Sequence, residues 1–367
     1  MKKFILDPKN TLTNVGNSIL GFFDVPKFHD SFEALDKILK ETNKQKVALI
    51  LLDGMGKIIF ETYKDDIHYL YSHILTEYKS VFPPTTVAAT TTLTTGKYPI
   101  ETCYLGWTQY FASRKAFINV FPSNNPFNHK EFFTPNVTST ELATTYIWDL
   151  INKTLKHNAA NISSFFKKTP EKEDDFEAFF KDADKLIKEH DFVYVYSTNP
   201  DHLLHVNGIK NETVRENVIY LEKKVKELVE NNKDTLFILT ADHGFADIEE
   251  INFKLHQDFL DTLNEDVFSI EPRFATVSVK DEAKFLELAN KYYGDYFYIK
   301  TKKELLEEHT FGYGVPNELF DSTTKDYFLI AKDKYCFYQS DEPIGFKGTH
   351  AGCLDSETEI YLLVFNA

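Results

Sequence analysis

Potential metal ligands recur in this chain where hydrophobic, strand-like runs end, although nearly the whole sequence separates the first from the last. Three apolar runs lead into acidic or imidazole side chains, and a fourth run is preceded by one. The runs and their ligands are 47–52 with Asp53, 192–196 with Asp201 and His205, 236–240 with Asp242 and His243, and 360–365 with His350. Open α/β sheets bind ligands in the crevice at the carboxyl ends of their strands, so these side chains are expected to converge. The pattern predicts a metal-dependent active site on an α/β fold.

The size and composition predict a soluble globular protein with more than one domain. Of the 367 residues, 43% are hydrophobic and 15% aromatic, which is enough for a packed α/β core and a smaller domain. The 41 basic and 56 acidic residues give a net charge of −15. This charge opposes non-specific binding to a nucleic-acid backbone or an anionic membrane surface. Long nucleic acids are therefore not expected as partners, and any phosphate must be bound locally by metal ions or backbone amides.

Three features predict a cytoplasmic protein without a membrane anchor. The apolar run near the amino terminus covers only residues 4–6, which is too short for a secretory signal. No uninterrupted apolar stretch approaches the length that spans a bilayer. The cysteines, Cys103, Cys336 and Cys353, are odd in number and lack a metal-binding spacing, so we expect no disulfide framework.

Segments with helical periodicity alternate with the strand-like runs, which is typical of parallel βαβ units. We expect helices at residues 30–41, 139–157, 174–190 and 211–232. After Asp247 the pattern changes to a strand at 272–279, a helix at 281–293, a strand at 295–300 and a hairpin formed by 327–331 and 334–338. We therefore predict that residues 1–250 and 341–367 form the metal-binding catalytic core. Residues 251–340 are predicted to form a small inserted α+β subdomain that covers the substrate.

The threonine-rich segment 82–99 is typical of a phosphate-binding helix. Two prolines set a rigid entry, Thr85 or Thr86 can cap the helix, small residues continue it, and Gly96 ends it. The first amides of a helix are free and lie in a positive dipole potential, which favours a phosphate. A hydroxyl at this position is also well placed for nucleophilic attack, although either threonine alone can be explained as a cap.

These motifs and their order resemble the alkaline phosphatase superfamily, and within it look most like the nucleotide pyrophosphatase/phosphodiesterase branch. The motifs are Asp53-Gly54, Phe82-Pro83-Pro84-Thr85-Thr86, Thr95-Gly96-Lys97-Tyr98-Pro99, the segment 200–205, Asp242-His243-Gly244 and Gly348-Thr349-His350. The resemblance implies a doubly wound, mostly parallel sheet with helices on both faces. It also implies that Thr86 is the nucleophile, because the segment 95–99 then aligns without a gap.

The resemblance divides the candidate ligands between two divalent metal ions. It assigns Asp53, Thr86, Asp242 and His243 to one ion, and Asp201, His205 and His350 to the other. Carboxylate oxygen and imidazole nitrogen suit Zn2+, with Mn2+ as the alternative because oxygen ligands are numerous. Two such ions about 3.5–4 Å apart stabilise the attacking and leaving oxygens of an in-line displacement. The expected mechanism is a double displacement through a phosphothreonyl intermediate.

The chain departs from the phosphodiesterase pattern in two places, which leaves the substrate open. Val87, Ala88 and Ala89 replace an aromatic residue, a proline and a phosphate-contacting asparagine, and residues 101–103 replace a Ser-His-Gly turn. A phosphomonoesterase or phosphonate hydrolase of the same superfamily is an alternative, as is a non-catalytic binding protein that metal ions stabilise. We expect a small phosphate ester or nucleotide as substrate, selected by residues 104–111 together with the insert.

Overall fold

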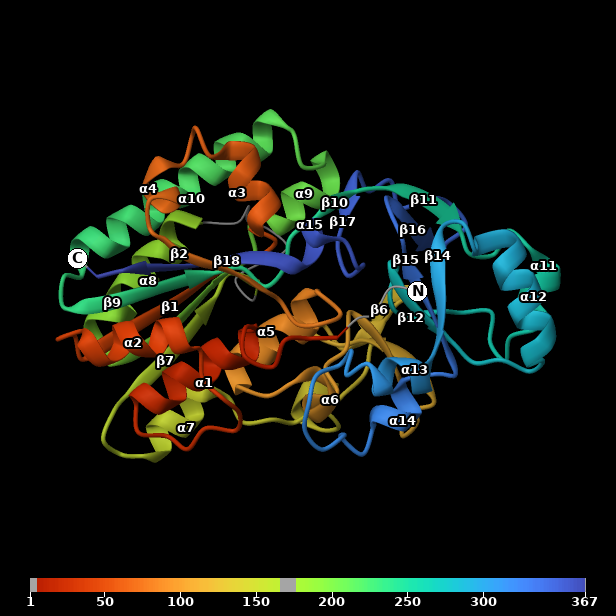
Figure 1. Ribbon diagram of the computed structural model, residues 1–367, viewed down its shortest axis with the longest axis horizontal. Helices are drawn as coiled ribbons and strands as arrows, with labels where there is room; N and C mark the ends of the chain where they lie inside the picture. The colour runs from red at the N-terminus through yellow and green to blue at the C-terminus, as the bar shows by residue number, and fades with distance from the viewer. Residues whose placement is uncertain (1–4, 166–175, 367) are drawn as a thin grey trace.

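The structure, a computed structural model shown in Figure 1, describes residues 5–165 and 176–366. One half of the protein is built on a six-stranded sheet with the order β2-β18-β9-β1-β8-β7. The strands are β1 (Lys46–Leu52), β2 (Ile74–Lys79), β7 (Ala159–Ser163), β8 (Phe192–Ser197), β9 (Thr235–Thr240) and β18 (Glu359–Phe365). β1 runs parallel to β8 and β9, and β7 runs parallel to β8. Only β18 is reversed, because it pairs antiparallel with both β9 and β2.

Helices cover both faces of this sheet, which confirms the doubly wound architecture. Figure 1 shows one group of helices above the sheet and another below it. The upper group includes α3 (Lys57–Tyr63), α4 (His68–Tyr71) and α10 (Glu212–Asn231), and the lower group includes α1 (Leu12–Phe22), α2 (Glu33–Glu41) and α7 (Ile147–Lys153). Every residue of β8 and β9 is buried, as is every residue of β1 after Lys46. Strands covered on both faces need such continuous apolar runs.

The helices predicted for the core are present in the structure, and one of them is shorter than predicted. The segment 211–232 forms α10, whose first turn is capped by the Asn211 side chain. The segment 174–190 contains α8 (Phe176–Glu189), and the predicted start at Asp174 lies outside the described residues. The segment 139–157 contains only α7, which follows a 3-10 helix at Val137–Ser139. The helix begins late because Tyr146 is extended and its amide donates to the Asp149 side chain, which caps the first turn.

An eight-stranded sheet lies beside the core, with the order β14-β15-β13-β12-β3-β4-β5-β6. The predicted insert supplies β12 (Ser269–Glu271), β13 (Phe274–Val277), β14 (Phe297–Thr301) and β15 (Tyr327–Ala331). An earlier part of the chain supplies β3 (Thr108–Phe111), β4 (Ala116–Asn119), β5 (Asn124–Asn125) and β6 (Asn128–Phe132). The two groups join where Ile270 pairs with Thr108. The sheet therefore draws strands from both sides of the predicted boundary, and the division of the chain at residues 250 and 341 stays a prediction.

The hairpin predicted for residues 327–331 and 334–338 is wrong. β15 pairs with β13 on one edge and with β14 on the other, so neither edge is free for β16 (Tyr335–Tyr338). β16 pairs instead in parallel with β11 (Glu249–Asn252). Buried Arg273 holds the connecting segment, because its Nη1 donates to the carbonyls of Asp333 at 2.7 Å and Tyr335 at 2.6 Å.

The insert has a hydrophobic core of its own. Its principal helix, α12 (Glu282–Tyr293), forms where the sequence predicts it and is capped by the Asp281 side chain. The aromatic residues of this core are Phe253, Phe259, Phe268, Phe285, Tyr293, Phe297, Tyr327 and Phe337. The shorter helices nearby are α11 (Gln257–Leu260), α13 (Lys302–Glu307) and α14 (Phe320–Thr323). Across the described parts of the chain, no helix is both long and apolar enough to cross a membrane.

Candidate active site

The seven predicted site residues lie together at one edge of the six-stranded sheet, with Thr86 on α5 (Thr86–Thr95). Asp53 follows β1, Asp201 begins α9 (Asp201–Asn207) after β8, and Asp242 follows β9, so all three arise at the carboxyl ends of parallel strands. His350 follows β17 (Gly348–Thr349) and precedes β18. Because β18 is antiparallel to β9, it begins at the edge where β9 ends. The reversed strand thus explains how His350 can precede its strand and still reach the site.

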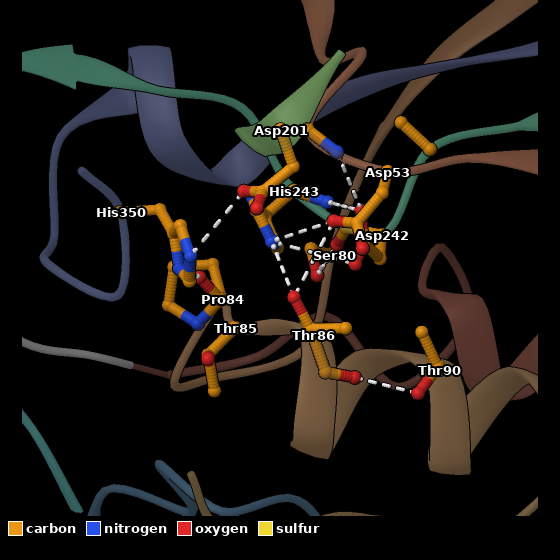
Figure 2. Close-up of polar contacts among 12 residues, drawn as sticks. Asp53, Ser80, Pro84, Thr85, Thr86, Thr90, Asp201, Asp242, His243 and His350 are labelled. Carbon is orange, nitrogen blue, oxygen red and sulfur yellow. Dashed lines mark hydrogen bonds and ion pairs between the residues drawn. The ribbon is translucent and has the colours of Figure 1, made fainter. Parts of the chain in front are cut away.

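One cluster of side chains contains Asp53, Thr86, Asp242 and His243, all of them buried. The Nε2 atom of His243 is 3.4 Å from Asp53 Oδ1 and 3.4 Å from Asp242 Oδ2. The Thr86 hydroxyl donates to Asp53 Oδ1 at 3.3 Å and is 3.2 Å from His243 Nε2. Figure 2 shows the four side chains pointing toward one another. The geometry therefore supports the first predicted set of ligands as one group.

A second cluster contains Asp201, His205 and His350. Asp201 Oδ1 is 3.4 Å from His205 Nε2 and 3.6 Å from His350 Nε2. Asp201 and His205 are four residues apart on α9 and share a face, as that spacing predicts. The rings of His350 and His243 stack with their centroids 3.7 Å apart. The two clusters are therefore adjacent, and ligand atoms of Asp53, Asp201 and His243 all lie within 4.8 Å of one another.

Each of the three imidazoles is oriented by a backbone carbonyl. The Nδ1 atoms of His205, His243 and His350 lie 3.0, 3.1 and 3.2 Å from the carbonyls of Gly348, Gly244 and Pro84, respectively. A neutral ring that donates through Nδ1 has an unprotonated Nε2, which is the form that binds a metal ion. Burial, followed by the neighbouring His243, lowers the pKa of His350 well below its ordinary value, so this ring is neutral at pH 7.

The carboxylates have the properties expected of a cation site. Asp201 Oδ1 and Asp242 Oδ2 are buried, and neither accepts a hydrogen bond from the described residues. Burial, followed by the charges of Asp242 and Asp201, raises the pKa of Asp53 well above its ordinary value. A buried group of carboxylates without positive charge is costly, and divalent ions supply that charge. The donor set therefore fits metal ions, and it is the arrangement expected of a metal-dependent hydrolase.

Thr85 and Thr86 face different partners. Thr85 is the N-cap of α5, and its hydroxyl donates to Glu271 Oε1 at 2.6 Å. Thr86 is the first helical residue, and its hydroxyl faces the first cluster (Figure 2). The first amides of a helix have no acceptor within the helix, so the amino end of α5 presents donors for an anion beside Thr86. The helix ends at Gly96, whose φ of 69° lies in the left-handed region that glycine adopts readily.

The sequence does not predict two further residues of the site. Tyr196, on β8, donates a hydrogen bond from its buried hydroxyl to Asp53 Oδ2. Glu271, the last residue of β12, is buried beside Thr85, and burial raises its pKa to about 7. A lone carboxylate that ends the strand-like run 268–271 is a weak signal for Glu271. Tyr196 gives no signal, because tyrosine is common in buried strands.

Comparisons with known proteins identify the family and the fold of this chain. Residues 47–352 match the family described as Type I phosphodiesterase / nucleotide pyrophosphatase. Murine ectonucleotide pyrophosphatase/phosphodiesterase 5, solved in an inactive form in complex with AMP, is 15% identical with a TM-score of 0.64, and the match covers 87% of each chain. Phosphonoacetate hydrolase from Sinorhizobium meliloti 1021, in complex with phosphonoformate, is 15% identical with a TM-score of 0.65, and the match covers 87% of this chain and 89% of that chain. A comparison with curated protein sequences gives no match. At such low identity the structural likeness establishes the fold.

Proposed function

The chain belongs to the type I phosphodiesterase / nucleotide pyrophosphatase family of the alkaline phosphatase superfamily, and from this premise we propose that it is a two-metal phosphodiesterase with Thr86 as its nucleophile. Membership makes the chain a metal-dependent phosphoric ester hydrolase. One observation carries the finer proposal. The Thr86 hydroxyl lies at the first turn of α5, 3.3 Å from Asp53 Oδ1 and 3.2 Å from His243 Nε2. A binding protein without catalysis would not need a hydroxyl at that point.

The two clusters are the basis for assigning two metal ions. In this proposal Asp53, Thr86, Asp242 and His243 hold one ion, and Asp201, His205 and His350 hold the other. Mixed oxygen and nitrogen donors favour Zn2+, with Mn2+ as the second choice. When bound, such ions lower the pKa of a bound alcohol or water and offset negative charge on the phosphoryl oxygens.

The side chains position one covalent step. Thr86 Oγ attacks phosphorus, the P–O bond to the leaving alcohol breaks, and the hydroxyl proton passes to Asp53, which already accepts its hydrogen bond. The leaving oxygen takes a proton from solvent. Asp53 then returns to solvent the proton that it received from Thr86. Water then attacks the same phosphorus. One hydrogen of that water stays on the released phosphate, and the other restores the Thr86 hydroxyl.

The surroundings of Thr86 favour a small phosphodiester as substrate. A diester phosphate carries one negative charge, whereas a monoester carries up to two, and the buried Glu271 carboxyl beside Thr85 opposes the additional charge. The net charge of −15 opposes long nucleic acids. The two structural neighbours are in complex with AMP and with phosphonoformate, which supports a small ligand with a phosphate or phosphonate group.

Replacing Thr86 tests the proposed nucleophile. Thr86→Ala should reduce diester turnover by about a thousandfold or more while the protein stays folded, because the covalent step is lost rather than substrate binding. Thr85→Ala is the matched control and should reduce diester turnover much less. Turnover should be measured with 4-nitrophenyl diesters after metal loading. Equal activity of Thr86→Ala and wild type, or a severe loss confined to Thr85→Ala, would show that the assignment is wrong.

Metal content tests the two-ion assignment independently of turnover. Elemental analysis of the active protein should give two divalent ions per chain, because the seven ligands fall into two sets. His350→Ala removes a ligand from one set only, so it should lower the content toward one ion. A fully active protein that holds one ion or none would exclude a two-metal mechanism.

A further inference from the structure

The two clusters of the candidate site differ in how far they are open to solvent. In the first cluster the side chains of Asp53, Asp242 and His243 are at most 4% exposed. In the second cluster the side chains of Asp201 and His205 are 17% and 16% exposed. The second cluster is therefore the more open end of the site, and exchange of metal ions with solvent is expected to begin there.

Two phenylalanine rings enclose the imidazole of His205. Phe245, which is fully buried, packs edge to face against it with the ring centroids 5.0 Å apart. Phe346 packs against it with the centroids 4.7 Å apart and is itself only partly buried. Phe245 thus forms the inner wall around this ligand, and Phe346 covers part of its solvent side. An apolar ring in that position limits the access of water and of competing ligands to a metal site.

Phe346 is fixed by hydrogen bonds on both sides of it in the sequence. Before it, the Glu250 carboxylate accepts the backbone amides of residues 344 and 345 at 3.1 and 2.9 Å. After it, the Lys347 amide donates to the carbonyl of His205 at 2.8 Å. Hydrogen bonds to a carboxylate are stronger than those between neutral groups. The Phe346 ring is therefore tied both to β11, which carries Glu250, and to α9, which carries the metal ligand (Figure 1).

Burial contributes little to the position of this segment, which connects β16 with β17. Residues 341–345 and Lys347 are exposed. Gly345 has a φ of 80°, and no atom lies within 4 Å of the point that a Cβ would occupy there. A segment with so few packing contacts opens easily once its hydrogen bonds are broken. The two bonds to Glu250 are thus the main restraint on the turn before Phe346.

We propose that Phe346 is a gate for metal exchange at His205 and that the Glu250 carboxylate is its latch. The proposal rests on the two-ion assignment of the proposed function and adds the route by which the ions leave. A histidine gives up a metal ion when its ring turns away or when another ligand reaches the ion, and the Phe346 ring opposes both events. The ion of the first cluster leaves later, because that cluster is more deeply buried.

Release of zinc from the loaded protein tests the gate without a substrate. The protein that holds two zinc ions per chain is mixed with excess 4-(2-pyridylazo)resorcinol, which changes colour when it binds zinc. The wild type should show two phases of equal amplitude, a fast one from the second cluster and a slow one from the first. His350→Ala lacks a ligand of the second cluster, so it should keep only the slow phase and thereby identifies the fast one.

Four variants separate the gate and its latch from unspecific effects. Phe346→Ala should accelerate the fast phase about tenfold or more and change the slow phase less than about twofold. Phe346→Tyr keeps the ring and should behave like the wild type. Glu250→Ala frees the turn and should accelerate the fast phase about three- to tenfold. Glu249→Ala is the matched control, because it removes the neighbouring carboxylate, whose partner is the exposed Lys334, and should change neither phase.

The outcomes distinguish the gate from the proposed function. If the loaded protein holds fewer than two ions per chain, the two-ion assignment is wrong and the gate falls with it. If two ions are held but leave in one phase, or Phe346→Ala releases them at the wild-type rate, the gate is overturned and the two-ion assignment stands. Equal release from Glu249→Ala and Glu250→Ala would overturn the latch, and this pair carries the test if Phe346→Ala does not fold.

Discussion

Arg273→Met removes the positive partner of a buried ion pair that supports the loop of His350. Arg273 and Glu357 are both fully buried, and Nε and Nη2 of the arginine donate to the two carboxylate oxygens at 2.7 and 2.8 Å. Glu357 also accepts the amides of Gly352 at 2.7 Å and Leu354 at 3.1 Å, shortly after His350. The pair therefore ties the turn between β12 and β13 to the loop that carries a ligand of the second cluster.

The structure allows the size of the effect to be worked out. Removing one partner of a buried pair costs about 3–5 kcal/mol, because the remaining charge is left uncompensated. Two amides still bind Glu357, which favours the lower end of that range. The carbonyls of Asp333 and Tyr335 each lose a donor, at about 1 kcal/mol each. We expect the free energy of unfolding to fall by about 5 kcal/mol. The metal ion proposed for the second cluster should bind about tenfold more weakly.

Urea unfolding in EDTA measures the change in the free energy of unfolding. Zinc titration of the folded protein measures the change in metal affinity. Lys284→Met is the control, because it breaks an exposed pair with Glu287 at 3.0 Å and should cost less than about 0.5 kcal/mol. Replacing Arg273 by methionine and Glu357 by glutamine together should recover about half of the loss, since no buried charge remains and the glutamine oxygen can still accept an amide hydrogen bond. The reasoning is refuted if Arg273→Met is as stable as the control, or if the double variant is no more stable than the single one.

Three further predictions concern single side chains. Tyr196→Phe removes a hydrogen bond to Asp53 and should weaken zinc binding about 10- to 100-fold. Tyr194→Phe deletes a buried hydroxyl that has no hydrogen-bond partner among the described residues, so this variant should bind zinc normally; equal affinities of the two variants would contradict the prediction. The pKa of Glu271 is raised to about 7, so its stabilising effect is complete below about pH 4 and is lost as pH rises through 7. In EDTA, the unfolding free energy of the wild type should therefore fall by about 2 kcal/mol more than that of Glu271→Gln between pH 5 and 8. Parallel plots of unfolding free energy against pH would contradict the raised pKa. Gly96→Ala should lower the unfolding free energy by about 1 kcal/mol, because alanine is strained at a φ of 69°; an unchanged Tm would contradict this.

The convergence of the ligands was predictable because its causes are local. Continuous apolar runs identify buried parallel strands, and residues that follow such strands must lie at one edge of the sheet. This reasoning placed Asp53, Asp201 and Asp242 correctly. It also placed His350, although for a different reason, because β18 runs antiparallel and brings its beginning to that edge.

The remaining features depend on contacts that no local pattern specifies. Tyr196 meets Asp53 across 143 residues of sequence, and Thr85 meets Glu271 across 186. β13 and β14 occupy both edges of β15, so β16 has to pair elsewhere, with β11. The two neighbouring strand-like runs therefore do not form the predicted hairpin. Pairing with distant segments is a property of the assembled sheet, and periodicity in one segment cannot reveal it.

The position of β18 in the sheet has a consequence for biosynthesis. Of the six strands of that sheet, β18 is made last by the ribosome, yet it occupies an interior place between β2 and β9. Until it arrives, the nascent chain has two unpaired strand edges, which are sites where chains aggregate. His350 also emerges only shortly before β18, so a growing chain cannot complete the second cluster of the candidate site. If the proposed metal site is correct, metal uptake would therefore mark a chain whose sheet has closed, and chaperone dependence should be greatest just before that point.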